Sequence, residues 1–333
     1  MRFLSFISVV LFSVGTQAAV IVPNPPSLDA KAYILLDATS GRVLVEHNAD
    51  ERIAPASLTK MMTSYVAIHE LSQGNIDEQV QIPISVKAWR MGGSKMFVRE
   101  GTQVPLIDLL RGIIVQSGND ASVAVAEYLS GSEEAYAGWM NQYAERFGMT
   151  NTNFENVTGW PADNHYSSAR DMAILSLHII KDHPKYYPLY AEKYYEYNKI
   201  RQPNRNTLLW RDPSVDGLKT GHTDAAGYCL AASAKRDDTR LIAVVMGARS
   251  DNSRSTETQK LLAYGFRYFE TRQVYDAGQV LETAKVWMGK EEQVELAVED
   301  TVNLTVPRGM KGELNVSVRT VGILKAPITQ GQE

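Results

Sequence analysis

The chain has 333 residues and a net charge of −4 at neutral pH. This length allows two compact domains, and an apolar content of 44% is enough for a sizeable core. Charged residues make up 22% of the chain and form no long runs, which argues against a disordered protein and against nucleic acid as a partner.

The first residues have the pattern of a secretory signal peptide. Arg2 is followed by an apolar run from Phe3 to Val14 and then by small residues. The run is too short to cross a bilayer well. We therefore assign residues 1–19 to a signal peptide that is cleaved after Ala18 or Ala19, and we expect the mature protein to be exported.

Hydrophobic periodicity predicts an α+β domain over residues 20–272. Two strands are predicted first, at 31–37 and 42–47. Helices are then predicted from Pro55 to Gly74, at 105–115, 120–129 and 134–147, and after a capping box at Ser168–Asp171. Three more strands, at 215–220, 227–235 and 240–248, and a helix at 255–271 follow. The stretch 151–166 is loop-rich. Strands at both ends with helices between them indicate one antiparallel sheet flanked by helices.

From about Tyr275 the pattern changes to short runs of alternating apolar and polar residues. Apolar residues recur at every second position at 294–298, 302–306 and 314–318. This pattern predicts a small all-β domain over residues 273–333. Because few strands can be counted before Glu333, we expect that domain to be incomplete.

A serine and a lysine with catalytic spacing stand at the start of the helix that follows Pro55. Ser57 and Lys60 are three residues apart, so they share a helix face. A serine hydroxyl needs a base to become a good nucleophile, and a lysine can serve if its surroundings keep it neutral. About one S-x-x-K match is expected by chance in a chain of this length, so the pair alone is weak evidence.

Two further motifs make the catalytic interpretation of that pair specific. Ser117-Gly118-Asn119 lies between two predicted helices, and Lys219-Thr220-Gly221 lies at the end of a predicted strand, before a hairpin. In this order and context the three motifs match the set S-x-x-K, S-x-N, K-T-G of serine acyltransferases. The sequence has no H-E-x-x-H, paired C-x-x-C or P-loop pattern, so no metal and no cofactor is predicted. The single cysteine, Cys229, is interpreted as a small buried apolar residue.

With these motifs the chain resembles the low-molecular-mass penicillin-binding proteins that are D-alanyl-D-alanine carboxypeptidases. The resemblance covers roughly residues 28–330 and is carried by 54–63, 117–121, 215–223 and the run that ends at Arg254. It implies an enzyme of the bacterial envelope that removes D-alanine from peptidoglycan stem peptides. It also implies that β-lactams act as covalent inhibitors.

The resemblance also implies roles for the motif residues. Ser57 would be the acylated nucleophile and Lys60 its base. Ser117 would relay a proton, and Asn119 would hold Lys60 and the substrate amide. Lys219 would add positive potential that keeps Lys60 neutral and attracts a carboxylate.

Further residues would bind the substrate. The backbone N–H groups of Ser57 and His222 would form the oxyanion hole, next to Thr220 and Gly221 of the third motif. Arg254 matches a position near the terminal carboxylate of the substrate. Arg205 is a second, weaker candidate for that carboxylate.

Relatives of this type usually have a longer β domain and a C-terminal amphipathic helix on the membrane. The sequence has neither in full, so we expect contact with the membrane surface only if the natural product continues past Glu333. Without such an extension we expect a soluble protein of the periplasm.

Three alternative functions remain open from the sequence. A class A β-lactamase would need a glutamate for deacylation, and loop 151–167 has no Glu-x-x-x-Asn, while Gly118 stands where those enzymes have aspartate. A D,D-endopeptidase that cuts cross-links would share the motifs. A non-catalytic penicillin-binding sensor would not need the complete set of nucleophile and base that is present here.

Overall fold

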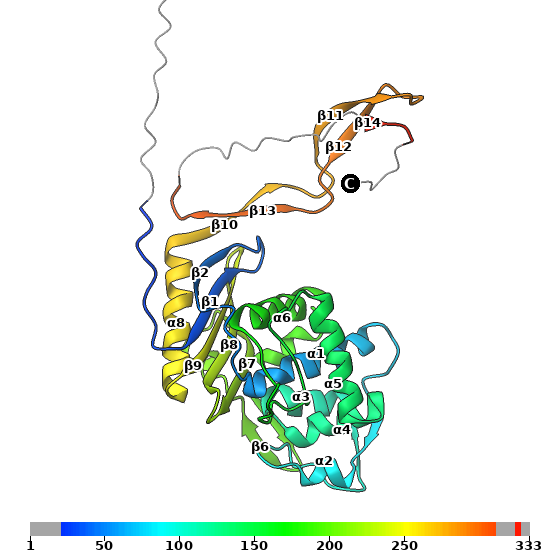
Figure 1. Cartoon of the computed structure of the whole chain (residues 1–333), viewed down its shortest axis with the longest axis vertical. Helices are drawn as coiled ribbons and strands as arrows, with labels where there is room; N and C mark the ends of the chain where they lie inside the picture. The colour runs from blue at the N-terminus through cyan, green and yellow to red at the C-terminus, as the bar shows by residue number, and fades with distance from the viewer. Residues whose placement is uncertain (1–20, 311–323, 328–333) are drawn as a thin grey trace, which may run out of the picture.

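The computed structural model describes residues 21–310 and 324–327. Its central feature is an antiparallel sheet in the order β2-β1-β9-β8-β7. The strands are β1 (Ala32–Asp37), β2 (Val43–His47), β7 (Val215–Thr223), β8 (Gly227–Arg236) and β9 (Thr239–Ala248). The N-terminal hairpin thus joins three strands from much later in the chain (Figure 1), which confirms the predicted fold class. β7 is the outer strand on one side.

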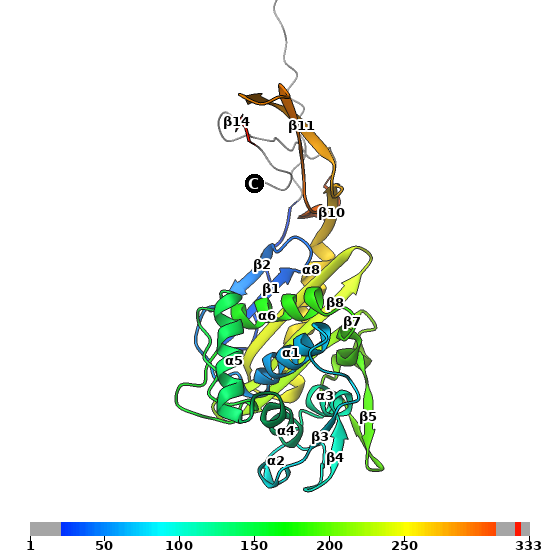
Figure 2. The ribbon, with the colours of Figure 1, turned by 90° about the vertical axis from the view of Figure 1, so that its right-hand side faces the viewer.

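Alternate residues of the sheet enter two separate cores. In β1, Ile34 and Leu36 belong to one core, and Tyr33 and Leu35 belong to the other. One face is covered by α8 (Asp251–Tyr268). The other face is covered by a helical layer that contains α1 (Thr59–Ser72), α3 (Leu106–Val115), α4 (Asn119–Ser130), α5 (Glu133–Arg146) and α6 (Ala169–Asp182) (Figures 1 and 2). Burial on both faces explains why β1 is a continuous apolar run.

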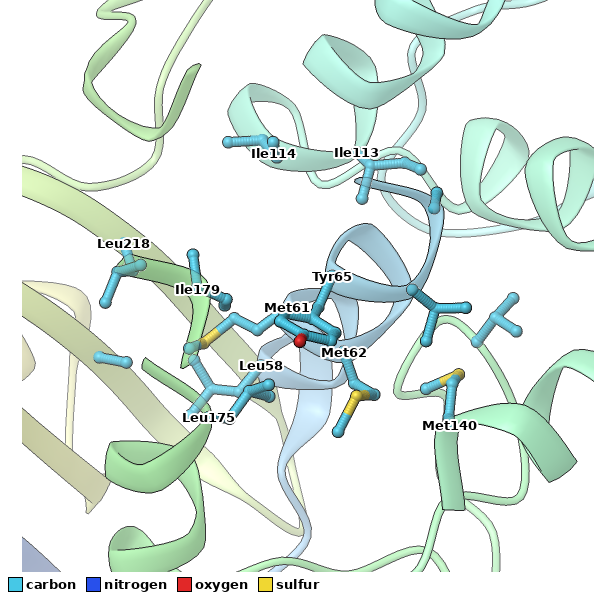
Figure 3. Packing of buried hydrophobic residues seen from close by; sticks show 14 of the residues in the cluster. Leu58, Met61, Met62, Tyr65, Ile113, Ile114, Met140, Leu175, Ile179 and Leu218 are labelled. Atoms are coloured by element: carbon cyan, nitrogen blue, oxygen red, sulfur yellow. The ribbon is translucent and has the colours of Figure 1, made fainter. Parts of the chain in front are cut away.

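Helix α1 lies at the centre of the helical layer. Figure 3 shows apolar side chains of α1 close to Met140 of α5, Leu175 and Ile179 of α6 and Leu218 of β7. The sequence predicted an amphipathic helix, but α1 is buried on nearly every side. Its buried polar residues are Thr59, Lys60, Thr63 and Ser64, and they need hydrogen-bonding partners inside the protein. These partners lead to the candidate active site.

Several element boundaries differ from the sequence-based expectation. The predicted helix at 255–271 was wrong at both ends, because Ser250 caps α8 by accepting a hydrogen bond from the Ser253 N–H, and Phe269–Tyr275 forms strand β10. Short elements that were not predicted are η1 (Ala56–Leu58), β3 (Gln81–Pro83), α2 (Val86–Arg90), β4 (Gln103–Pro105), η2 (Tyr187–Ala191), β5 (Tyr194–Tyr197), β6 (Ile200–Pro203) and α7 (Leu208–Arg211).

The C-terminal part is built from β-strands, as the alternation predicted. β10 pairs antiparallel with β13 (Val302–Pro307), and β11 (Val280–Trp287) lies between β12 (Gln293–Ala297) and β14 (Leu324–Lys325). β10 runs across residue 272, where the sequence placed a domain boundary. The predicted signal peptide, the predicted strand at 314–318 and the last residues lie outside the described residues. No helix within 21–310 is long and apolar enough to cross a membrane.

A buried carboxyl group joins this part to the first sheet. Asp37 lies at the end of β1 and is fully buried. Its Oδ2 accepts hydrogen bonds from the hydroxyl of Thr271 in β10, at 2.6 Å, and from that of Thr305 in β13, at 2.7 Å. The β10–β13 pair is therefore bonded to the hairpin β1–β2.

Candidate active site

The first motif places a hydroxyl against an amine at the start of α1. Ser57 lies in η1, directly before α1, and the Nζ of Lys60 is 3.1 Å from its Oγ. Lys60 is only 1% exposed. Its Nζ also donates to the carbonyl oxygen of Thr158, at 2.5 Å. The amine is thus held where it can exchange a proton with the hydroxyl.

The surroundings of Lys60 favour its neutral form. The pKa of Lys60 is lowered to about 7, first by desolvation and then by the positive charge of Arg205, while Asp120 acts in the opposite direction. The pKa of Lys219 is also lowered, chiefly by desolvation and further by the charges of Lys60 and Arg205. The sequence assigned the charge effect on Lys60 to Lys219, and the charges of these two lysines do oppose each other; Arg205 is a further cation that lowers the pKa of Lys60. A lysine that is partly neutral near pH 7 can serve as a general base.

The second motif lies in the connection between α3 and α4, as predicted. Ser117 has a positive φ of 61° and is 2% exposed, and its Oγ has no hydrogen-bonding partner within the described residues. Asn119 donates from Nδ2 to the carbonyl oxygen of Gly92, at 2.7 Å. This contact differs from the one with Lys60 that the resemblance implied. A hydroxyl left without a partner is available to a ligand.

The third motif lies in the middle of β7 rather than at its end. Lys219 is 2% exposed, and its Nζ donates to the Thr220 carbonyl at 3.1 Å. Gly221 lets β7 approach η1, because a Cβ there would lie 2.9 Å from the carbonyl oxygen of Pro55 and 3.2 Å from the Leu58 nitrogen. His222 is exposed and its ring lies against Tyr228. The outer strand thus borders the nucleophile directly.

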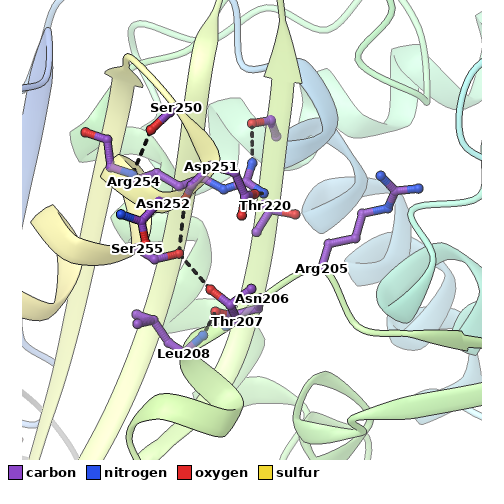
Figure 4. A network of polar contacts seen from close by, with 12 residues as sticks. Arg205, Asn206, Thr207, Leu208, Thr220, Ser250, Asp251, Asn252, Arg254 and Ser255 are labelled. Carbon is purple, nitrogen blue, oxygen red and sulfur yellow. Dashed lines mark hydrogen bonds and ion pairs between the residues drawn. The ribbon is translucent and has the colours of Figure 1, made fainter.

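The two arginine candidates have different surroundings. Arg254 is 5% exposed, and its guanidinium donates to the Gly221 carbonyl, at 3.0 Å, and to Asp251. Arg205 is exposed and donates from Nε to the Gln116 carbonyl, at 3.3 Å. Figure 4 shows the Arg205 side chain extended away from the group formed by Arg254 and Asp251. Arg205 therefore has more donors available for a ligand than the more favoured candidate.

The loop between α5 and α6 contributes residues that sequence reasoning missed. Besides the Thr158 carbonyl, Val157 accepts from the Thr63 hydroxyl at 2.8 Å, and His165 Nε2 is 2.7 Å from the Thr59 hydroxyl. Gly159 has a φ of +81°, and a Cβ there would overlap the carbonyl oxygen of Ala56. Spacing patterns could not reveal these contacts, because they join residues about a hundred positions apart. The loop therefore covers the first turn of the nucleophile helix.

Among the described residues, no group of three or more potential metal-ligating side chains occurs. Cys229 is fully buried, and burial raises the pKa of its thiol to about 11. This confirms the interpretation of Cys229 as a buried residue rather than a nucleophile.

The fold and the contact between Ser57 and the buried Lys60 are those of a class, the serine acyl-transfer enzymes with a serine–lysine pair. Residues 19–250 match the family model described as D-alanyl-D-alanine carboxypeptidase, and residues 269–333 match the model of the penicillin-binding protein 5 C-terminal domain. The chain therefore belongs to the D-alanyl-D-alanine carboxypeptidase family.

Individual relatives agree over most of the chain. The D-alanyl-D-alanine carboxypeptidase DacA of Escherichia coli is 46% identical over 93% of this chain and 79% of its own length, and DacC of the same species is 45% identical over 97% and 82%. The crystal structure of penicillin binding protein 5 from Haemophilus influenzae has a TM-score of 0.89 at 45% identity, covering 93% of this chain and 92% of that one. These similarities confirm the expected D-alanyl-D-alanine carboxypeptidase class.

Proposed function

We propose that this protein removes the terminal D-alanine from peptidoglycan stem peptides through an acyl-enzyme on Ser57. The observation that carries the proposal is the 3.1 Å contact between Lys60 Nζ and Ser57 Oγ. It involves a buried lysine with a pKa of about 7. Such a lysine can take the hydroxyl proton at neutral pH, whereas an exposed lysine would stay protonated.

In the acylation step, Ser57 Oγ attacks the carbonyl carbon of the penultimate D-alanine while Lys60 takes the hydroxyl proton. The C–N bond then breaks, and the nitrogen of the leaving D-alanine receives a proton through Lys60 or Ser117. In the second step, water attacks the ester carbonyl, the C–Oγ bond breaks, and the shortened peptide leaves as a carboxylic acid. The proton returns to Oγ, so both steps conserve atoms and charge.

Substrate binding is assigned to the groups that surround Ser57. The N–H groups of Ser57 and His222 would stabilise the oxyanion, because η1 and β7 lie against each other at Gly221. The terminal carboxylate would be bound by Lys219, the hydroxyl of Thr220 and the exposed Arg205. Arg254 would instead support the site, since its guanidinium is bonded to the Gly221 carbonyl and to Asp251.

β-Lactams should acylate the same serine. Crystal structures of penicillin-binding protein D2 from Listeria monocytogenes, 28% identical with a TM-score of 0.67 and covering 73% of this chain, were determined in ampicillin-bound and cefotaxime-bound forms. The strained amide of such a drug would replace the scissile amide of the peptide. We also propose that the signal-like N-terminus directs the protein to the bacterial envelope, where peptidoglycan is found.

Mass spectrometry tests the proposal directly. The native protein, incubated with benzylpenicillin, should gain one covalent adduct on the peptide that contains Ser57, and a peptide ending in D-Ala-D-Ala should lose one D-alanine. Ser57→Ala should lose both reactions while near-UV circular dichroism shows a native fold. Lys60→Arg should also fail, because arginine does not release its proton at working pH. An adduct on folded Ser57→Ala, or steady turnover by it, would overturn the assignment of the nucleophile.

A further inference from the structure

A second hollow, of about 270 Å³, lies outside the Ser57 site. It is formed by α2, by the segment from 95 to 99 and by the tip of the β5–β6 hairpin, and its lining includes Trp89, Lys95, Phe97, Arg99, Asn198 and Ile200. These elements lie at the end of the molecule farthest from β11 (Figures 1 and 2). The roles proposed above use none of these residues.

Phe97 is held in an unfavourable conformation that exposes its ring. Its φ is +69°, which is an outlier for a bulky residue, and the side chain is 46% exposed. The cause lies one residue after Asn119: the buried carboxylate of Asp120 accepts hydrogen bonds from the N–H groups of Met96, Phe97 and Val98. Backbone strain and an exposed aromatic ring both cost free energy, and strain of this kind is concentrated at ligand sites.

The hollow combines apolar surface with positive charge. Trp89 is 39% exposed and Ile200 is 40% exposed, next to the Phe97 ring. Lys95 and Arg99 are not ion-paired with any acidic group within the described residues, although the whole chain has a net charge of −4. One Lys95 donor is used by the Trp89 carbonyl, at 3.1 Å. A cationic, aromatic surface on an acidic protein is complementary to an anionic ligand with an apolar part.

Hydrogen bonds join the segment that precedes the hollow to the second motif. The carbonyls of Gly92 and Ser94 accept hydrogen bonds from the side chain and the backbone of Asn119, at 2.7 and 2.8 Å. Phe97 is three residues beyond Ser94, so its Cα lies within about 11 Å of the Ser94 Cα. An extended peptide covers that distance with about three residues.

We infer that this hollow is a subsite for the acyl-donor side of the substrate, namely a peptide segment that carries a free carboxylate two or three residues before the scissile bond. Its carboxylate would contact Lys95 and Arg99, and its aliphatic part would pack on Phe97, Trp89 and Ile200. The inference rests on the proposed function, since the segment reaches the hollow only when its D-Ala-D-Ala end is at Ser57. Asp120 then links the catalytic motif to selection of the longer substrate.

Three substrates test the subsite in the full protein. They are L-Ala-γ-D-Glu-L-Lys-D-Ala-D-Ala, the same peptide with D-isoglutamine in place of D-glutamate, and diacetyl-L-Lys-D-Ala-D-Ala. The native enzyme should have a kcat/KM about fivefold higher for the glutamate peptide than for the isoglutamine peptide. The double variant Lys95→Gln/Arg99→Gln should remove that preference, because an exposed charge pair contributes about this factor.

Phe97→Gly isolates the apolar contribution, because glycine accepts a positive φ and keeps the loop folded. It should lower kcat/KM for the long peptides relative to the short one by about fivefold. Matched controls are Arg267→Gln, an exposed cation of α8, and Trp287→Ala, an exposed ring of β11. Both controls should keep the native ratios.

The outcomes separate this inference from the proposed function. If the native enzyme cleaves none of the three peptides, the carboxypeptidase function itself is wrong. If it cleaves all three but with equal kcat/KM for the glutamate and isoglutamine peptides, the function stands and the anionic subsite is overturned. Retention of the native preference by the double variant would equally overturn the subsite.

Discussion

The imidazole of His165 donates its Nε2–H to the hydroxyl of Thr59, with 2.7 Å between the two heavy atoms. The direction follows from the other ring nitrogen, since Nδ1 accepts a hydrogen bond from the Glu155 N–H at 3.0 Å and must therefore carry no proton. Burial, followed by the charge of Lys60, lowers the pKa of His165 to about 4. A neutral histidine thus connects the loop between α5 and α6, whose Thr158 carbonyl accepts a hydrogen bond from Lys60, to the start of α1.

Loss of the hydrogen bond between His165 and Thr59 should change both the stability of the protein and its rate of acylation. His165→Ala should lower the free energy of unfolding by about 1–3 kcal/mol, because the buried hydroxyl of Thr59 and the N–H of Glu155 both lose their hydrogen bonds. The loosened loop should admit water to Lys60 and relieve the desolvation that lowers its pKa. The acid limb of the benzylpenicillin acylation rate should therefore move to higher pH.

Urea unfolding and acylation rates measured from acid to alkaline pH check this prediction. His165→Gln retains a donor and an acceptor and should lie closer to the native protein in both measurements. A pH midpoint that is the same in the native protein and in His165→Ala would show that the loop does not control Lys60, even if stability falls.

A second prediction concerns the charge of Arg205. Its cation destabilises protonated Lys60, so Arg205→Gln should raise the pKa of Lys60 above about 7. Less of the base is then neutral at a given pH, and the acid limb of acylation should shift upward. Arg211→Gln is the matched control, because Arg211 is bonded to Asn252 and is not among the charges that act on Lys60. A downward shift in Arg205→Gln would contradict the electrostatic explanation.

A third prediction separates the two arginines as ligands of the terminal carboxylate. The native enzyme should cleave a D-Ala-D-Ala acid about ten- to a hundredfold faster, in kcat/KM, than the corresponding amide, as expected for a charge-assisted contact. Arg205→Gln should remove most of this difference. Arg254→Gln should slow both substrates alike, because it disturbs Gly221 instead.

The four rates form a double-mutant cycle between protein and substrate, which isolates the pairwise contribution. Equal cleavage of acid and amide by the native enzyme would favour an endopeptidase. A selective loss for the acid in Arg254→Gln would instead restore Arg254 as the carboxylate ligand, as the sequence had suggested.

A fourth prediction uses two glycines with the same backbone conformation. Gly159 and Gly131 both have a φ of +81°, but a Cβ at Gly131 meets nothing within 4 Å, whereas one at Gly159 would overlap the Ala56 carbonyl. Gly131→Ala should therefore lower the free energy of unfolding by only about 1–2 kcal/mol, the cost of placing an alanine in the left-handed conformation. Gly159→Ala should cost more and should also slow acylation, since it pushes the loop away from η1. The thermal unfolding midpoint and the acylation rate of both variants test this prediction. Equal losses of stability in Gly131→Ala and Gly159→Ala would rule out the clash with Ala56.

The sequence predicted what depends on short spacing and on residue type. Ser57 and Lys60 are close because residues three apart share a helix face, and Ser168 caps α6 as its motif indicated. The Thr158 carbonyl was not predictable, because a backbone oxygen carries no residue-type signal and lies 98 residues from Lys60. The predicted start of α8 at Ser255 was wrong, because the helix is capped by Ser250.

Arg254 shows a different limit of sequence reasoning. The family resemblance placed it near the terminal carboxylate of the substrate, but its surroundings decide which partners it has. Asp251, one turn earlier in α8, and the Gly221 carbonyl accept hydrogen bonds from its two terminal nitrogens, while its buried Nε has no partner within the described residues. The sequence could thus predict that Arg254 lies near the active site, but it could not predict which of its N–H groups are free to bind a substrate.

The buried Asp37 has a consequence for how the protein opens. Separation of the β10–β13 pair from the first sheet would leave a carboxyl group without its two threonine partners, which is costly in a buried position. The amides of β10 and β13 should therefore exchange with deuterium on the same slow timescale as those of β1. The amides of β11 and β12, which are not bonded to this carboxyl group, should exchange earlier. The β10–β13 pair would then unfold together with the sheet that contains β1, although the sequence pattern places a domain boundary between them.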